Sequence, residues 1–325
     1  MTPNISAVGI LDFGVAHHGE DAREIVEHTI HAARRADALG FGRYWLAEHQ
    51  KGECRWATPE LVLALIARET TRIRVGAGGL LLSTHNALRV ANDYSLLAQL
   101  HPGRIDIGLA RGTPGENVLA LLEPTRVVAG SPDDFSSKLV ALISYLRGIA
   151  RPQHAYYRAR AFPTPSHLPE LWLLGSGGAS GEIAAQYGLP FAHSIFHRPD
   201  TPLAPIANYQ RDFRPSAWLA GPRTTVAIAG ICAETRELAH EIAASQPNQI
   251  TLNVVGTAHD WCERVTDIVS DTSADEIMYF DASPLPEQRL RAYELLGEAL
   301  NATAAKRAAA VKRPPDYAHA FSNSA

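Results

Sequence analysis

A glycine- and serine-rich turn at residues 175–180, GSGGAS, has the composition of an anion-binding loop. It follows an apolar run and precedes a helical pattern, so its backbone N–H groups would lie at a helix N-terminus, which attracts negative charge. Many such turns only cap a helix. However, Arg111 lies just past the end of another predicted strand and offers a guanidinium suited to phosphate. Together, Arg111 and the hydroxyls of Ser176 and Ser180 predict a phosphate site.

A second stretch, Gly-Ala-Gly-Gly at residues 76–79, removes nearly all side-chain volume from a strand that begins at Ile73 and Val75. Glycine weakens a strand, so three glycines in four positions need a reason. One interpretation is a bend or a bulge. The other is a flat ligand that lies against bare backbone. Beside a phosphate site, the segment predicts a wall for the ring system of the same cofactor.

Two histidines lie where strands are predicted to end. Glu48-His49 follows the segment RYWLA, and His85 lies in the polar stretch after the glycines. An imidazole titrates near neutral pH and is therefore suited to moving protons. The alternative for His49 is a histidine packed beneath a loop. The alternative for His85 is a capping role together with Asn86.

No metal site is predicted. The adjacent His17 and His18 point apart and have no acidic partner near them. Cys54, Cys232 and Cys262 are far apart, without the paired spacing of a zinc site, and suit the reducing cytoplasm.

Composition excludes several classes of protein. The formal net charge of −4 lacks the basic excess that is typical of nucleic-acid-binding proteins, and no apolar run is long enough to span a membrane. The N-terminus lacks the basic start and apolar core of a signal peptide. We therefore expect a cytoplasmic protein that binds neither nucleic acid nor membrane.

Along the chain, strand patterns alternate with helical patterns. This alternation predicts a (β/α)8 barrel, in which the carboxyl ends of the strands bring the polar stretches to one mouth. The alternative is a doubly wound open sheet, but a GxGxxG motif after the first strand is absent. The predicted strands are 5–11, 43–47, a run from residue 73, 104–109, 171–174, 189–194, 224–232 and 275–280.

The predicted helices connect these strands. They cover residues 21–39, a helix from Thr58, and then 87–98, 131–146, 180–187, 203–213, 234–245, 258–270 and 287–302. We expect one barrel domain at 1–304 and a flexible C-terminal tail at 305–325, which is rich in alanine, lysine and proline.

The segment VGAGGLLLSTHNALRVANDYSLLAQLHPGRIDIGLARG closely resembles the bacterial luciferase-like flavin monooxygenases, and its HPGRIDIGLARG portion is highly specific. RYWLAEH, LLGSGGASGEIAAQYGLPF, ADEIMYF and LRAYELLGEAL match further segments of that family. The resemblance implies a luciferase-like barrel that binds FMN. It makes His49 the active-site histidine and implies that Glu48 and His85 line the substrate pocket. The cofactor would contact Gly78, Gly79, Ala110, Arg111, Ser176, Gly177 and Ser180.

The same resemblance implies the reaction. Reduced FMN (FMNH2) and O2 would form a flavin hydroperoxide, which transfers one oxygen atom to a small organic substrate. A separate flavin reductase would supply the reduced FMN, and the family is commonly dimeric. The apolar face of the helix after Thr58, with Leu61, Leu65 and Ile66, would either form the homodimer interface or cover its own barrel. The alternatives are a deazaflavin-dependent oxidoreductase of the same fold and a non-catalytic flavin-binding relative.

The resemblance also implies a backbone feature, a cis peptide bond between Gly78 and Gly79 beneath the flavin ring. An ordinary trans β-bulge is the alternative.

Three departures accompany the resemblance. Luciferases have a cysteine where this chain has Ala110, and the family usually has a second histidine where this chain has Gln50. Residues 233–254, near the seventh strand, form a shortened insertion beside relatives that carry extra helices there.

Overall fold

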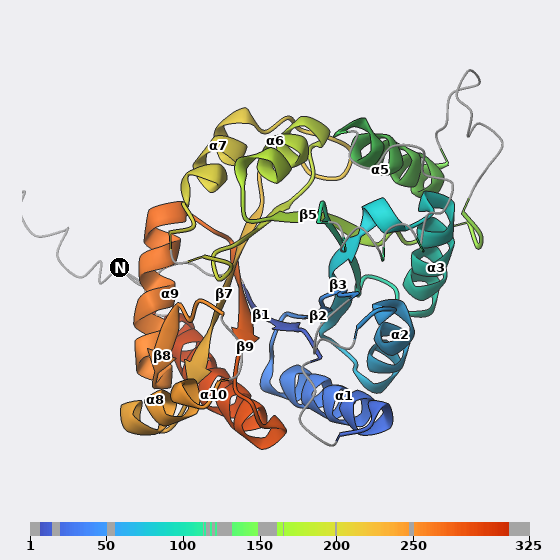
Figure 1. Ribbon diagram of the computed structural model, residues 1–325. Coiled ribbons are helices and arrows are strands. Elements are labelled where there is room, and N and C mark those ends of the chain that lie inside the picture. Colours follow the sequence, from blue (N-terminus) through green and yellow to red (C-terminus); the bar gives the residue numbers. More distant parts are fainter. Residues whose placement is uncertain are drawn as a thin grey trace, which may run out of the picture.

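A computed structural model describes residues 7–14, 20–50, 56–112, 114, 118, 121, 132–148, 161–164, 166–198, 200–246 and 250–311. Within these residues, parallel strands close into a barrel surrounded by helices, which confirms the predicted fold (Figure 1). Neighbours along the chain pair in order, and β9 pairs with both β1 and β7 to complete the ring. The barrel strands are β1 (Ala7–Asp12), β2 (Arg43–Leu46), β3 (Arg74–Leu81), β4 (Ile105–Ala110), β5 (Glu170–Gly175), β6 (Phe191–Ser194), β7 (Thr224–Cys232) and β9 (Glu276–Asp281).

The helices lie outside the barrel, between successive strands, except α10, which follows the last strand β9. Amphipathic patterns explain why they form there, because each buries one face against the strands. Helix α1, for example, begins with a side-chain cap at Asp21 and ends at a left-handed glycine, Gly40. They are α1 (Ala22–Leu39), α2 (Pro59–Glu69), η1 (Leu82–Thr84), α3 (Ala87–Leu100), α5 (Pro132–Arg147), α6 (Gly178–Tyr187), α7 (Ala204–Asp212), α8 (Arg236–Ala244), α9 (Ala258–Thr272) and α10 (Pro286–Val311).

One strand was not predicted. β8 (Val254–Gly256) pairs with the end of β7, outside the closed ring. The sequence pattern predicted only helical segments on either side of these residues. The physical reason for the pairing is a close backbone approach, since a Cβ at Gly230 would lie 2.0 Å from the Val254 carbonyl oxygen. A strand of three residues is too short to show a periodic pattern, so it could not be identified from the sequence.

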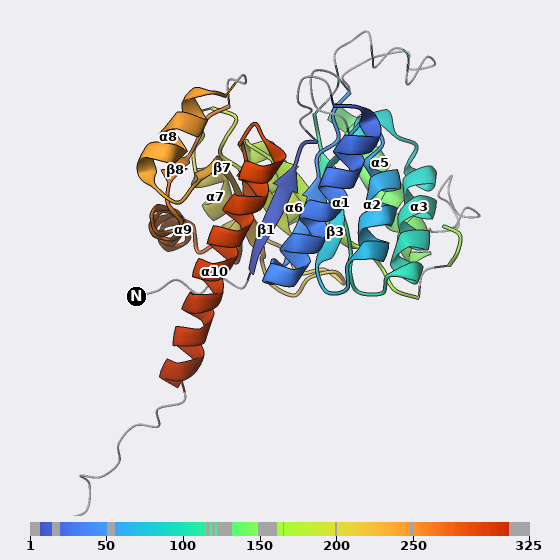
Figure 2. The same ribbon diagram turned by 90° about the horizontal axis from the view of Figure 1, so that it is seen from below.

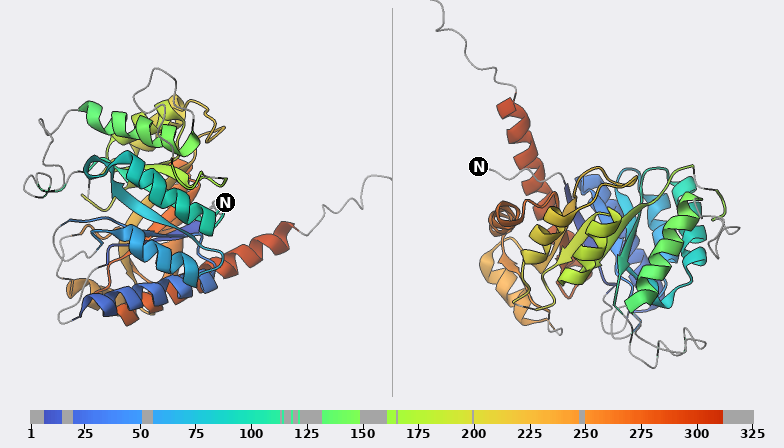
Figure 3. Two further views of the ribbon diagram at one scale, coloured as in Figure 1. Left: turned by 90° about the vertical axis from the view of Figure 1, so that its right-hand side faces the viewer. Right: turned by 90° about the horizontal axis from the view of Figure 1, so that it is seen from above.

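Helix α10 was predicted too short. It continues to Val311, past the predicted end at residue 302, and projects beyond the barrel (Figures 2 and 3). Residues 305–311 of the predicted tail are therefore helical, and 312–325 lie outside the described residues. The division into a domain at 1–304 and a tail stays a prediction.

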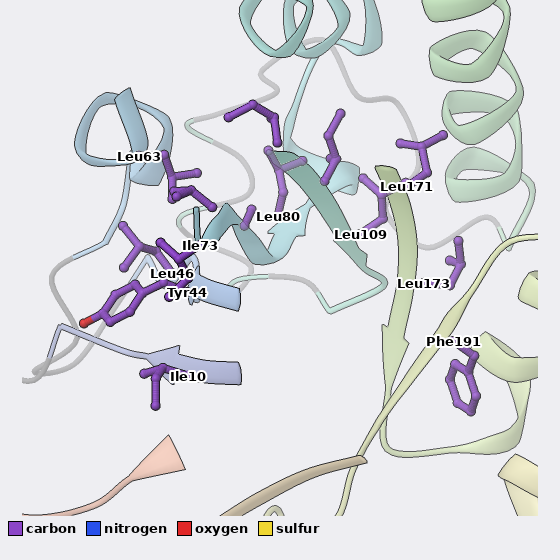
Figure 4. Packing of buried hydrophobic residues seen from close by; sticks show 14 of the residues in the cluster. Ile10, Tyr44, Leu46, Leu63, Ile73, Leu80, Leu109, Leu171, Leu173 and Phe191 are labelled. Carbon is purple, nitrogen blue, oxygen red and sulfur yellow. The ribbon is translucent and has the colours of Figure 1, made fainter. Parts of the chain in front are cut away.

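The main hydrophobic core lies between the strands and the helices. Tyr44 and Leu46 of β2 point outward into this layer, whereas Arg43 and Trp45 alternate with them and point into the barrel. Figure 4 shows the outer packing, in which Leu63 of α2 and Ile73, beside β3, join the same cluster. Strands buried on both faces read as continuous apolar runs, which is why they were predictable.

An ion-pair network fills the amino-terminal end of the barrel interior. The buried Arg43 guanidinium donates to Asp106 (2.6 Å) and to Glu276 (2.6 Å). Arg74 pairs with Asp106, and Arg223 pairs with Glu170 and Glu276. Burial lowers the pKa of Arg43, but the surrounding carboxylates outweigh it and the pKa is raised. The network therefore keeps its charges paired beneath the layer that contains Trp45 and Trp172.

Candidate active site

A cavity of about 710 Å³ lies where the carboxyl ends of the barrel strands meet. This is the end at which barrels of this type carry their ligands. Of the residues predicted as a site, His85 does not line the cavity. Those that do are Glu48, His49, Gly78, Gly79, Ala110, Arg111, Ser176, Gly177 and Ser180.

The glycine segment of β3 forms one wall. The peptide bond between Gly78 and Gly79 is cis, which confirms the predicted backbone feature. The register of β3 against β4 also shifts between Gly78 and Leu80. A Cβ at Gly78 would lie 2.7 Å from the Trp45 Cβ, so a side chain does not fit there. This wall of the cavity is therefore bare backbone, and its contact with a flavin ring stays a prediction.

The turn after β5 forms a second wall and has the features of an anion site. Gly177 is the N-cap of α6 and makes no side-chain capping bond, and a Cβ added there would meet no atom within 4 Å. The first N–H groups of α6 therefore have no side-chain cap and lie at the positive end of the helix dipole. Ser176 and Ser180 line the same region, and Arg111 lies across it at the end of β4. This donor set fits a phosphate group.

Glu48 binds its neighbours with both carboxylate oxygens. Its Oε2 accepts from the Leu81 backbone N–H (2.8 Å), and its Oε1 accepts from the Gln50 side-chain amide (2.8 Å). The His85 Nε2 lies 2.9 and 3.0 Å from the two oxygens. Glu48 therefore ties the end of β2 to the end of β3. Gln50 contributes a donor to this contact.

His85 was predicted either to line the site or to cap a helix with Asn86. The side chain of Asn86 alone caps α3, accepting from the backbone N–H groups of Leu88 and Arg89. His85 instead bonds Glu48, and its role toward a substrate stays a prediction. Burial lowers the pKa of His85, but the hydrogen bond and charge of Glu48 outweigh burial, so the pKa is raised.

This raised pKa predicts how stability depends on pH. The His85–Glu48 pair should be fully stabilising below the unfolded pKa of about 6.5 and should weaken as pH rises through the higher folded value. His85→Leu should therefore cost about 1.5–3 kcal/mol of unfolding free energy at pH 6 and less at pH 9. Urea unfolding at both pH values measures this. His85→Gln keeps a hydrogen-bond donor but cannot ionise. Its unfolding free energy should therefore lack the part that depends on the ionisation of His85, as should that of His85→Leu. A cost for His85→Leu that is equal at both pH values would contradict the prediction.

His49 lines the cavity directly after Glu48. Its backbone N–H donates to the Trp56 carbonyl (2.9 Å), and its ring packs 5.1 Å from the ring of Phe13. Gly14 fixes the loop that carries Phe13. Its φ of +59 is one that residues with a side chain rarely adopt, and a Cβ added there would clash with Trp56. The His49 backbone is therefore fixed by Trp56, and its ring packs against Phe13 at the cavity wall.

Sequence reasoning missed several cavity residues. Phe13 follows β1, Phe196 and His197 follow β6, and Met278 lies within β9. Phe13, Phe196 and His197 belong to no motif, and the available signal was their position just past a predicted strand end. Met278 lies within the ADEIMYF segment, which was matched to the last strand of the family without a role for any single residue. Burial lowers the pKa of His197, and the charge of His49 lowers it further.

Among the described residues, no group of three or more histidine, cysteine, aspartate or glutamate side chains could hold a metal ion. His17 and His18 lie outside those residues. Within the described part of the chain, no helix combines the length and apolarity needed to cross a membrane.

Comparisons with known proteins agree on one family. A family model for luciferase-like monooxygenases matches residues 8–313. A luciferase-like monooxygenase of Escherichia coli is 35% identical over 239 residues, 72% of this chain and 69% of that protein. The crystal structure of apo-MsnO8 has a TM-score of 0.82 at 28% identity, covering 91% of this chain and 98% of that one.

A more distant structure shows the same fold. It is the oxygenating constituent of 3,6-diketocamphane monooxygenase from Pseudomonas putida, a type II Baeyer-Villiger monooxygenase in complex with FMN. Its TM-score is 0.69 at 15% identity, covering 90% of this chain and 96% of that one.

Proposed function

The chain belongs to the luciferase-like monooxygenase family, and from this premise we propose that it uses reduced FMN and O2 to oxygenate a small organic substrate. One observation carries the proposal. A single cavity contains the anion-binding turn at Ser176–Ser180, Arg111, the bare backbone of Gly78–Gly79 and His49. These features fit the phosphate, the ring system and the proton chemistry of one flavin.

The residues have separate tasks in this proposal. Arg111 and the N-terminus of α6 hold the phosphate, and Gly78–Gly79 lets a flat ring approach the backbone. Bound reduced FMN supplies the electrons that activate O2. His49 accepts or donates protons at its ring nitrogens, and the apolar side chains of the barrel interior exclude water. A separate flavin reductase in the same compartment, which we expect to be the cytoplasm, supplies the reduced FMN.

The direct test is a binding comparison. Purified protein is titrated with FMN and with a deazaflavin cofactor, and then with reduced FMN without O2 before O2 is admitted. We expect FMN and its reduced form to bind, and an added organic substrate to be oxygenated. Binding of the deazaflavin alone would favour hydride transfer instead. FMN binding with no oxygenated product from any candidate substrate would favour a flavin-binding relative.

The phosphate assignment gives a prediction of its own. Arg111→Ala removes a charge-assisted hydrogen bond, so FMN affinity should fall by about 1.5–3 kcal/mol, or about 10- to 150-fold. Riboflavin lacks the phosphate, so its affinity should change little. Quenching of flavin fluorescence measures both. Arg211→Ala, at an exposed arginine of α7, is the matched control and should affect neither ligand. Equal weakening of FMN and riboflavin would contradict the assignment.

The predicted homodimer also has a structural basis. Leu61 and Leu65 of α2 are 69% and 47% exposed, and Leu96 and Leu100 of the neighbouring α3 are also exposed (Figure 1). Ile66, which the sequence grouped with the first two, is instead fully buried in the core. We propose that this leucine surface of α2 and α3 binds a second copy.

The dimer prediction is tested at this leucine surface. Replacing both Leu61 and Leu65 with glutamate should halve the mass measured by light scattering, from twice 35.2 kDa to that of one chain. The introduced glutamate carboxylates would be buried in the interface without a cationic partner, which disfavours the dimer. Leu238→Glu, on α8, is the control and should leave the dimer intact. A wild-type protein that is monomeric at micromolar concentration would contradict the prediction.

A further inference from the structure

The cavity has two unlike halves. The polar half consists of Arg111 and the turn at 175–180, contributed by β4 and β5. The other half is built from strands β1, β2, β6, β7 and β9, and most of the side chains that line it are apolar. The larger apolar ones are Leu11, Phe13, Trp45, Phe196 and Met278, and the polar residues of this half are Glu48, His49, Gln50, Ser194 and His197. If a flavin phosphate occupies the polar half, the apolar half is the space that remains for a substrate.

Aromatic rings form a connected set in the apolar half. The ring of Phe13 lies 4.4 Å from that of Phe280 and 6.0 Å from that of Phe196. His49 packs on Phe13 at 5.1 Å, and His197 packs on Phe196 at 4.5 Å. Rings attract one another at such distances in tilted and edge-to-face arrangements. A further flat ring entering this space would therefore gain the same contacts.

Small residues leave room for that ring. Ala47, Ala192 and Ala227 line the cavity among the larger side chains. A planar molecule loses little conformational freedom on binding, which favours it over a flexible chain of similar size.

The charges of the wall disfavour an anionic substrate. Apart from histidines, Glu48 and Arg111 are the charged residues among the described lining. Glu48 already accepts from Leu81, Gln50 and His85, and Arg111 lies in the polar half. Burial and the charge of His49 lower the pKa of His197, which favours its neutral form. Outside the polar half, only the two histidines among the described lining residues could offer a cation, and a carboxylate placed against Phe196 would lose its water, which is costly.

We propose that the substrate is a neutral aromatic molecule whose ring packs against Phe13 and Phe196. This inference rests on the proposed function, because it assigns the polar half of the cavity to FMN. It concerns binding only, and it adds the class of substrate that family membership leaves open.

The experiment compares two probes with the same ring system. The neutral 2-naphthol and the anionic 2-naphthoate are titrated into the protein at pH 7.5 by calorimetry, with and without FMN. We expect 2-naphthol to bind at least roughly tenfold more tightly than 2-naphthoate in both cases. Equal or tighter binding of 2-naphthoate would overturn the proposal.

Variants locate the bound ring. Phe196→Ala should weaken 2-naphthol binding roughly five- to tenfold. Because Phe196 is buried, Phe196→Leu serves as a second variant that preserves most of the packing and should also weaken binding. Phe162→Ala, at a phenylalanine that is 80% exposed, is the matched control. Unchanged affinity in both Phe196 variants would also overturn the proposal.

The same titrations separate this inference from the proposed function. Arg111→Ala should weaken FMN and leave 2-naphthol unchanged, because the two occupy opposite halves. If wild-type protein fails to bind FMN, the proposed function fails. Selective binding of 2-naphthol that depends on Phe196 would still support the aromatic site. Binding of 2-naphthol that is lost in Arg111→Ala but retained in Phe196→Ala would place the ring in the polar half and contradict it.

Discussion

Arg43→Met is expected to lower the free energy of unfolding by about 3–5 kcal/mol. The Arg43 side chain is almost completely buried and is shared by Asp106 and Glu276, which are buried as well. Methionine has a similar length but no charge, so these buried carboxylates would lose their central partner. Urea unfolding followed by circular dichroism measures the difference.

The matched control for Arg43 is Arg72→Met. The Arg72 side chain is 71% exposed, and its ion pair with Asp37 has a separation of 3.9 Å. Such a pair contributes about 0–1 kcal/mol, so the control should remain close to the wild type. A loss below about 1 kcal/mol in Arg43→Met would mean that the network is not a main source of stability.

His49→Ala is expected to fold and to bind FMN while forming product about 10²- to 10⁴-fold more slowly, the usual contribution of a positioned acid or base. The imidazole lines the cavity, and the backbone of His49 is fixed by a bond to Trp56 that alanine also makes, so the variant removes the proton carrier while the loop stays anchored. The substrate is an aromatic compound that the wild-type protein oxygenates. The rate of product formation is measured by chromatography. Oxidation of reduced FMN is followed separately by absorbance.

The control for His49 is His31→Ala, at an exposed histidine of α1, which should match the wild type in every assay. Loss of FMN binding in His49→Ala would show that the histidine holds the cofactor instead. Product formation at the wild-type rate would exclude a role in proton transfer.

The sequence by itself determined the barrel and most of the candidate site. Buried parallel strands appear as continuous apolar runs, and helices appear as amphipathic periods, so their alternation could be read directly. Polar stretches at strand ends, such as Glu48-His49 and the turn at 175–180, had to meet once the strands closed into a ring. The resemblance supplied the cis bond at Gly78–Gly79, which the structure confirms.

Only the tertiary structure decided contacts between residues that are distant in sequence. His85 bonds Glu48 across 37 positions, and Arg43 bonds Glu276 across 233. The sequence around His85 or Arg43 does not predict which distant residue each side chain binds. The missed strand β8 depends on close approach to Gly230, and the burial of Ile66 depends on how α2 is turned against the barrel. Phe13 and Phe196 became one aromatic wall because strand closure brings β1 and β6 to the same mouth, a geometry that local patterns do not contain.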